Sequence, residues 1–179
     1  MPHGLKLRIS TLIFTCACAL QLATSQISSA EDIGKARPVP KNQQHFVCNV
    51  GYSIQQCHEQ MSVLRPLLTK YGAGRLGDWT WVLVKSGDWK SLMQLHGMDP
   101  NSPSFSFLAR RQTFFEEAMV APVPGRSAEL ISEWSGSIGQ LRDLAVTHEL
   151  GHALCNERNE RRADAYGRLL REGQTVICK

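Results

Sequence analysis

Apolar residues recur three or four positions apart along several parts of the chain, the spacing that places them on one face of a helix. The clearest pattern runs through Leu141, Leu144 and Ala145. Just before it, Ser137 followed three residues later by Gln140 matches a helix-capping box. These patterns predict helices over residues 54–71, 89–96, 127–134, 138–155 and 160–171.

Three segments in the middle of the chain have the composition of strands. Residues 79–85 are rich in β-branched and aromatic side chains and are bounded by turn residues. Residues 104–108 and 112–120 predict two further strands, although the second is also compatible with a short helix. A helix, then strands, then helices is the order of an α+β fold, in which the two kinds of element are segregated.

The chain of 179 residues suits one small domain, preceded by a polar segment. Residues 31–45 contain Pro38 and Pro40 and show no apolar periodicity, which predicts an extended leader. The folded domain is therefore expected over residues 46–179.

The N-terminal segment has the features of a secretory signal peptide. Lys6 and Arg8 precede an apolar stretch over residues 12–23, and small residues follow up to Ala30. We predict a signal peptide over residues 1–30, cleaved near Ala30, and export to the periplasm or out of the cell. The apolar stretch is shorter than the roughly 20 residues that span a bilayer, so no stable membrane anchor is expected.

The charge of the chain gives no reason to expect nucleic acid as a partner. Lys6 and Arg8 leave with the signal peptide, which has no acidic residue, so the formal charge falls from +4 to +2. The sequence also lacks a basic run with interleaved aromatic residues, which nucleic-acid binding would favour.

Four of the six cysteines lie beyond the predicted signal peptide: Cys48, Cys57, Cys155 and Cys178. An even number in an exported chain predicts two disulfides, for which three connectivities exist. We expect Cys48 to pair with Cys57 and Cys155 with Cys178, because these pairings need the least rearrangement of the chain.

A metal-binding pattern lies on the predicted helix 138–155, where the sequence HELGH is an HExxH motif. His148 and His152 are four residues apart and share a helical face, so both imidazoles can bind one zinc ion. Glu149 points about 100° away from His148 around the helix axis. From there it can reach a water molecule in the open coordination position of the metal.

Two histidines supply only two of the three protein ligands that a catalytic zinc ion takes, so a nearby carboxylate is needed. The next predicted helix offers Glu160 and Asp164. If the two helices are antiparallel, Glu160 lies level with His152, and Asp164 lies level with His148. The carboxylate that is not a ligand is expected to hold a histidine ring by its free nitrogen.

At these residues the sequence resembles the zincin metallopeptidases, and in particular the gluzincins, whose first motif is matched by His148, Glu149 and His152. Their second motif is a Glu ligand followed by Ala and then Asp or Asn, and the sequence ERRAD at residues 160–164 is similar. The compact spacing resembles the minigluzincins and the small metallopeptidases that cleave phage repressors. The resemblance implies a zinc ion at His148, His152 and Glu160, with Glu149 as general base, in a small zincin-like fold.

The resemblance covers residues 138–170 and departs from other zincin branches. Arg158 stands where a metzincin has its third histidine, which excludes that branch. Aspzincins have an Asp ahead of Tyr-Gly, and Asp164 is similar but its spacing is one residue short. Asp164 therefore stays an alternative to Glu160 as third ligand, and Glu157 is a further alternative.

Zincins lay an extended peptide against an exposed strand edge beside the metal-binding helix, and the resemblance implies the same here. Our candidate is the predicted strand 112–120, because it is the last strand before the histidine helix. The loop that follows contains Pro122 and Pro124, which stop further pairing.

We therefore expect an exported hydrolase with Zn²⁺ as cofactor, most simply a metallopeptidase acting on a peptide or protein substrate. One alternative is a non-catalytic binding or interaction module that keeps the helix pair. Another is a zinc hydrolase of a non-peptide amide. A closed structural zinc site with Cys155 as fourth ligand would leave Glu149 without a role.

Overall fold

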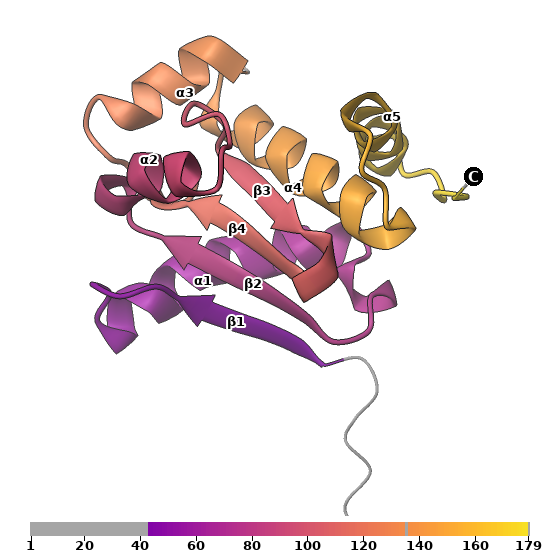
Figure 1. Ribbon diagram of the computed structural model, residues 1–179, viewed down its shortest axis with the longest axis horizontal. Helices are drawn as coiled ribbons and strands as arrows, with labels where there is room; N and C mark the ends of the chain where they lie inside the picture. Colours follow the sequence, from indigo (N-terminus) through magenta and orange to yellow (C-terminus); the bar gives the residue numbers. More distant parts are fainter. Residues whose placement is uncertain (1–42, 135, 179) are drawn as a thin grey trace, which may run out of the picture. The chain divides into compact units, whose positions relative to one another are not determined.

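The computed structural model describes residues 43–134 and 136–178, which form a small α+β domain (Figure 1). The fold class predicted from the sequence is thereby confirmed. The predicted signal peptide, residues 1–30, and the predicted leader up to residue 42 lie outside the described residues. Within the described part of the chain, no helix has the length and apolar character needed to cross a membrane.

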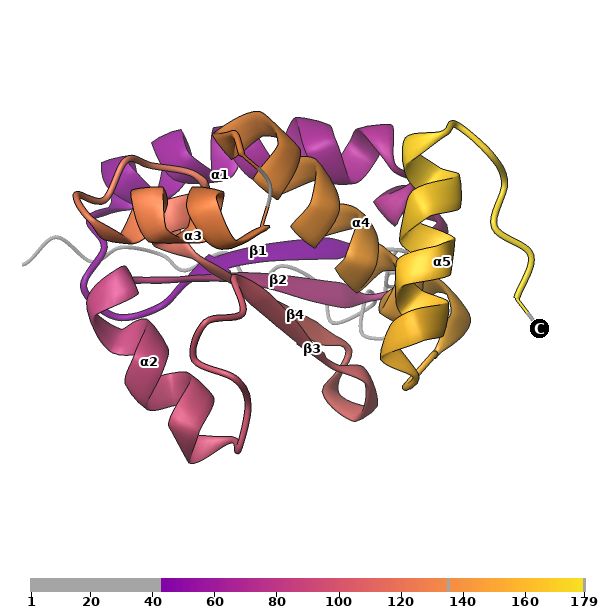
Figure 2. The same cartoon turned by 90° about the horizontal axis from the view of Figure 1, so that it is seen from above.

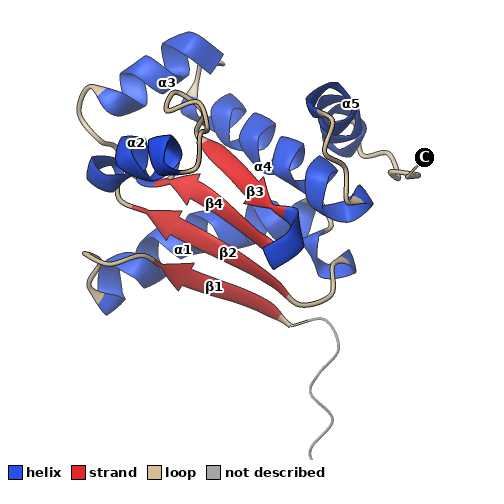
Figure 3. Cartoon of the chain, in the orientation of Figure 1, coloured by secondary structure: helices blue, strands red, loops and turns tan. Residues whose placement is uncertain are grey.

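A mixed four-stranded sheet forms the centre of the domain (Figure 3). In spatial order, its strands are β1 (Gln44–Cys48), β2 (Trp79–Val84), β4 (Gln112–Glu116) and β3 (Ser104–Phe107). β1, β2 and β4 are parallel, whereas β3 runs antiparallel to β4. The two edges of the sheet are therefore β1 and β3.

The α-helices of the described residues cover both faces of this sheet (Figure 2). They are α1 (Ile54–Lys70), α2 (Ser86–Leu95), α3 (Arg126–Trp134), α4 (Ile138–Cys155) and α5 (Glu160–Arg171). Seen from above, α1, α3 and α4 lie on one side of the sheet and α2 lies on the other. All the helices predicted from the apolar spacing are present, with small shifts at their ends.

Alternating side chains of β2 divide the core between the two faces of the sheet. Trp81 and Leu83 are completely buried in a cluster with residues of α1 and α4. Val82 and Val84 instead pack with Trp89 of α2. A strand sends successive side chains to opposite faces, and here both faces are covered, which explains why β2 is almost continuously apolar. This packing holds α4, which carries the HExxH motif, on the sheet.

The prediction of a strand over residues 112–120 was wrong in the length of the strand and in its role as the edge that binds an extended peptide. The strand ends at Glu116, and residues 117–119 form a short 3₁₀-helix. β4 is also paired on both sides, with β2 and with β3, so it offers no free edge to a peptide. The free edge beside α4 belongs to β3, because β3 turns back antiparallel to β4 and covers it.

The fold also begins earlier than the sequence pattern predicts. Gln44 and His45, which the pattern places in the leader, belong to β1 and pair in parallel with β2. The residues of β1 alternate between half-buried and exposed. The strand therefore lacks the apolar run that marks β2, and pairing with β2 is what defines it.

Two disulfides join the described cysteines as expected. Cys48 at the end of β1 is bonded to Cys57 of α1, and their Cα atoms are 5.8 Å apart. Cys155, the last residue of α4, is bonded to Cys178 in the C-terminal segment, with a Cα separation of 5.2 Å. Both predicted pairings are confirmed, and the second ties the chain that follows α5 back to the end of α4.

Candidate metal centre

The helix that carries the motif begins at the predicted cap and is buried through its middle. The Ser137 hydroxyl accepts a hydrogen bond from the backbone N–H of Gln140 at 3.2 Å, which satisfies one of the free donors at the helix start. Further along, His152 is 8% exposed and Glu149 is 2% exposed. Glu149 and His152 therefore lie where α4 contacts the sheet and α5.

Two glycines allow α5 to approach α4 closely. Gly151 of α4 belongs to the HExxH motif and faces the backbone of Ala163, and Gly167 of α5 faces the backbone of Thr147. A Cβ atom at Gly167 would lie 2.9 Å from the backbone oxygen of Thr147, so the helix backbones are nearly in contact. This approach brings Glu160 and Asp164 within reach of the histidines.

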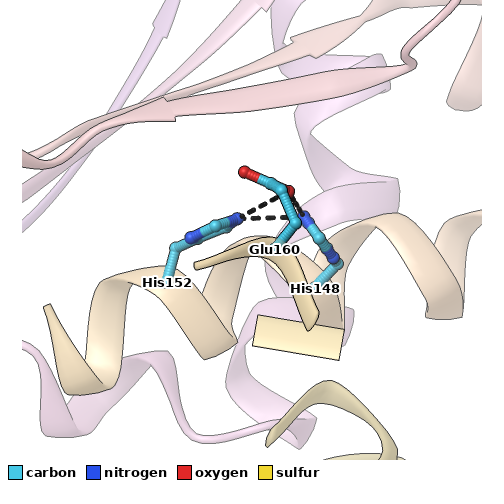
Figure 4. Close-up of side chains that lie close together, drawn as sticks. All are labelled: His148, His152 and Glu160. Atoms are coloured by element: carbon cyan, nitrogen blue, oxygen red, sulfur yellow. Dashed lines mark hydrogen bonds and ion pairs between the residues drawn. The ribbon is translucent and has the colours of Figure 1, made fainter. Parts of the chain in front are cut away.

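Three potential ligand atoms converge between the two helices (Figure 4). The Nε2 atoms of His148 and His152 are 3.0 Å apart. Glu160 Oε2 lies 3.1 Å from the Nε2 of His148 and 3.4 Å from that of His152. His148, His152 and Glu160 thus form a group that could hold a metal ion.

The spacing of these atoms fits a small tetrahedral ion. Zinc binds nitrogen and carboxylate oxygen at about 2.0 to 2.2 Å, which puts tetrahedral ligands roughly 3.3 to 3.6 Å apart. The observed separations of 3.0 to 3.4 Å are close to that range.

The opposite nitrogens of both rings are held in place. His148 Nδ1 is hydrogen-bonded to Asp164 Oδ1 at 2.7 Å. His152 Nδ1 is hydrogen-bonded to the backbone oxygen of Glu157 at 2.6 Å. Such contacts fix the orientation of a ligating imidazole and aim its other nitrogen at the metal. Asp164 therefore contacts the outer nitrogen of His148, while Glu160 lies beside the Nε2 atoms of both histidines.

The carboxylate of Glu157, the remaining candidate ligand, is engaged in the turn between the helices. It accepts hydrogen bonds from the backbone N–H of Asn159 at 2.8 Å and from Arg162. These interactions, of which the bond from the Asn159 backbone is the largest, lower the pKa of Glu157. Glu157 thus stabilises the turn that positions α5.

The acidic surroundings raise the pKa of His148 above its ordinary value. Burial alone lowers this pKa, but the charge of Glu149, the hydrogen bond and charge of Asp164, and the charge of Glu160 raise it by more. Protons therefore compete with a metal ion for this ring, because only the neutral ring is a ligand.

A cleft of about 580 Å³ opens beside the ligand group. α4 contributes His148 and Glu149 to its lining, and β3 contributes Ser106 and Phe107. Glu149 is not among the converging ligand atoms, and its Oε2 accepts a hydrogen bond from the Ser106 hydroxyl at 2.6 Å. Nothing in the sequence pattern singles out Ser106, which is one serine in a strand 43 positions away from Glu149.

The alternative of a closed structural zinc site is wrong. Cys155, its supposed fourth ligand, is bonded to Cys178 and is not available to a metal.

The sequence matches no model of a protein family, and comparisons with curated proteins and with solved structures find no match.

Proposed function

We propose that this chain is an exported zinc-dependent hydrolase, a metallopeptidase of the HExxH type. The observation that carries this proposal is the convergence of His148, His152 and Glu160, with the buried Glu149 on the helix of the two histidines. The signal-like N-terminal sequence and the two disulfides support export, because disulfides persist in oxidising compartments.

The donor set favours zinc over other common metal ions. Two imidazole nitrogens and one carboxylate oxygen are a usual set of protein ligands in catalytic zinc sites. Calcium takes more ligands, all of them oxygen, and magnesium also prefers oxygen. The resemblance of residues 148–164 to the gluzincin motifs agrees with this choice.

Glu149 is placed to move the proton in the reaction we propose. A zinc ion bound here would polarise a scissile carbonyl and acidify a water molecule. Glu149 accepts the proton of the attacking water and passes it to the leaving amine. Its burial beside the cleft keeps bulk water away from the carboxylate and so strengthens its interaction with the reacting groups.

The substrate in this proposal is an extended peptide that lies along β3. Among the described strands, only β4 pairs with β3, so the other edge of β3 is open. Ser104, Phe105 and Phe107 of this strand line the cleft beside Glu149. An edge strand binds an extended peptide through main-chain hydrogen bonds, which provide affinity with little side-chain selectivity.

A second cavity, of about 460 Å³, offers a place for a substrate side chain. It shares His148 with the cleft, and its lining includes the apolar Trp134 and Leu141 as well as the charged Asp164 and Arg171. The apolar part of this lining favours an apolar side chain next to the scissile bond.

Metal analysis of the purified exported protein, combined with hydrolysis of a quenched-fluorescence peptide library, tests the proposal. We expect about one zinc ion per chain and hydrolysis that a chelator abolishes and zinc restores. Glu149→Gln should keep the zinc and lose the hydrolysis. Glu172→Gln, an exposed glutamate that follows α5, is the matched control and should behave as wild type.

The alternatives give different results in the same experiment. If the folded protein binds no zinc at micromolar concentration, the proposal is rejected, and the non-catalytic binding module is the remaining alternative. A zinc protein that cleaves no peptide but hydrolyses small amides would indicate the non-peptide hydrolase.

A further inference from the structure

A chain of hydrogen bonds leads from the interior of the sheet to Glu149. The indole Nε1–H of Trp79 donates to Thr113 Oγ1 at 3.0 Å. Thr113 Oγ1 lies 2.7 Å from Ser106 Oγ, and Ser106 Oγ lies 2.6 Å from Glu149 Oε2. Three strands, β2, β4 and β3, thus contribute one side chain each.

The chemistry of the groups at its two ends gives this chain a single direction. An indole N–H only donates, and the Ser106 hydroxyl donates to Glu149 Oε2. The Ser106 hydroxyl therefore uses its one proton in the hydrogen bond to Glu149 and must accept a hydrogen bond from Thr113. The Thr113 hydroxyl in turn donates to Ser106 and accepts from Trp79. Every proton in the chain points toward Glu149.

The register of the sheet and the burial of the side chains maintain this chain of hydrogen bonds. Ser106 and Thr113 are directly opposite each other in the antiparallel pairing of β3 with β4, so their side chains share a face. Thr113 is completely buried, and Trp79 is 4% exposed. Water therefore has little access to the Thr113 end and is not expected to replace a missing partner there.

We propose that Ser106 is a positioning residue for Glu149 and that Thr113 and Trp79 fix the direction of its hydroxyl. This inference rests on the proposed function, in which Glu149 is the general base. The hydrogen bond holds Oε2, and among the described residues no hydrogen bond engages Oε1. Oε1 is then the oxygen that takes the proton from water, and Ser106 keeps the carboxylate from turning away from the cleft.

The kinetic test compares variants of the residues in this chain of hydrogen bonds with a control variant outside it. Removing a hydrogen bond to a charged group should lower kcat about 10- to 100-fold for Ser106→Ala. KM and zinc content should stay near the wild-type values. Thr113→Val, which does not touch Glu149, should lower kcat in the same direction, and Thr113→Ser should restore it. Thr80→Val makes the same replacement on the other face of the sheet and should have no such effect.

A second readout uses the metal-free protein and needs no activity. The indole N–H resonance of Trp79, identified by its loss in Trp79→Phe, should move upfield in Ser106→Ala and in Glu149→Ala, because its acceptor is no longer polarised. Thr80→Val should leave this resonance in place. If wild-type protein cleaves nothing but the resonance moves, the proposed function fails while the chain of hydrogen bonds stands.

Three results would overturn the inference. An unchanged kcat in Ser106→Ala together with an unmoved Trp79 resonance would show that the chain of hydrogen bonds does not influence Glu149. A raised KM with an unchanged kcat would make Ser106 a substrate contact. Loss of zinc from Ser106→Ala would make it a support of the metal site.

Discussion

Gly151 of α4 lies so close to Ala163 of α5 that a Cβ atom on Gly151 would fall 2.5 Å from the Ala163 carbonyl oxygen. Contact of backbone with backbone at this distance is possible only for glycine. The consequence reaches the candidate metal centre, because the separation of the two helices decides how far the Glu160 carboxylate lies from the histidines.

Gly151→Ala should therefore weaken both the fold and the metal site. We expect a loss of about 1 to 3 kcal/mol in the free energy of unfolding of the metal-free protein, as for other overpacked contacts. Zinc affinity should fall as well, because α5 must move away. Denaturant unfolding and competition with a zinc chelator measure the two effects.

Gly139→Ala is the matched control for this substitution. Gly139 is an exposed residue in the first turn of α4, and a Cβ atom there meets no neighbour within 4 Å. This change should be neutral or stabilise the helix by up to about 1 kcal/mol and leave zinc affinity unchanged. Equal zinc affinity in both variants would show that the spacing of α4 and α5 does not control the metal site.

The ligand and orienting residues should differ in their effects on zinc affinity. His148→Ala and His152→Ala should abolish binding, and Glu160→Ala should weaken it more than Asp164→Ala does. A group that only orients a ligand typically contributes 10- to 100-fold, so we expect a loss of about that size for Asp164→Ala. Isothermal titration with zinc gives the order, and a larger loss for Asp164→Ala would make Asp164 the ligand.

Loss of the disulfide between Cys155 and Cys178 should lower stability and zinc affinity together. The bridge closes a loop with a sequence separation of 23 at the end of the helix pair that carries the ligands. In the chain-entropy model, closing a loop of this length stabilises the fold by roughly 3 kcal/mol. Replacing both cysteines by Ser and measuring unfolding and zinc binding tests this expectation.

The other disulfide is the control for this experiment. Cys48 and Cys57 join β1 to α1, away from the metal ligands. Their replacement by Ser should lower stability without changing zinc affinity. A similar loss of zinc affinity in both double variants would point to general destabilisation.

The ion pair between Glu117 and Lys85 should make stability depend on pH in the acidic range. Burial raises the pKa of Glu117, but hydrogen bonds from Lys85, Gln60 and the Ser86 backbone outweigh it, so the net shift is downward. A lowered pKa in the folded state stabilises the fold above the ordinary carboxyl pKa of about 4.3, and this contribution is lost as the pH falls through the folded value.

Glu117→Gln should therefore be less stable than wild type at neutral pH. On acidification from pH 5 to pH 3, its free energy of unfolding should fall by less than that of wild type. Urea unfolding of the metal-free protein at several pH values measures the difference. Glu133→Gln, an exposed position on α3, should keep the wild-type pH dependence. Parallel pH profiles for Glu117→Gln and wild type would contradict the expectation.

The sequence by itself determined the features that depend on local spacing. His148 and His152 share a face because a helix repeats every 3.6 residues, and the apolar positions around them predict that helix. The order of Glu160 and Asp164 on the next helix follows from the same periodicity, once the two helices are antiparallel. The disulfides join cysteines that are close in sequence, so the simplest pairing was also the observed one.

Only the tertiary structure decided which strand lies at the edge and which side chain meets Glu149. β3 and β4 are both short strands in which phenylalanines alternate or mix with polar residues, and the edge position of β3 follows from the order in which the strands pair. Ser106 reaches Glu149 through strand pairing and helix packing across 43 positions of sequence. Such contacts have no local period, because their position is set by the packing of the whole sheet against α4, and a single serine in a strand therefore carries no sign of them.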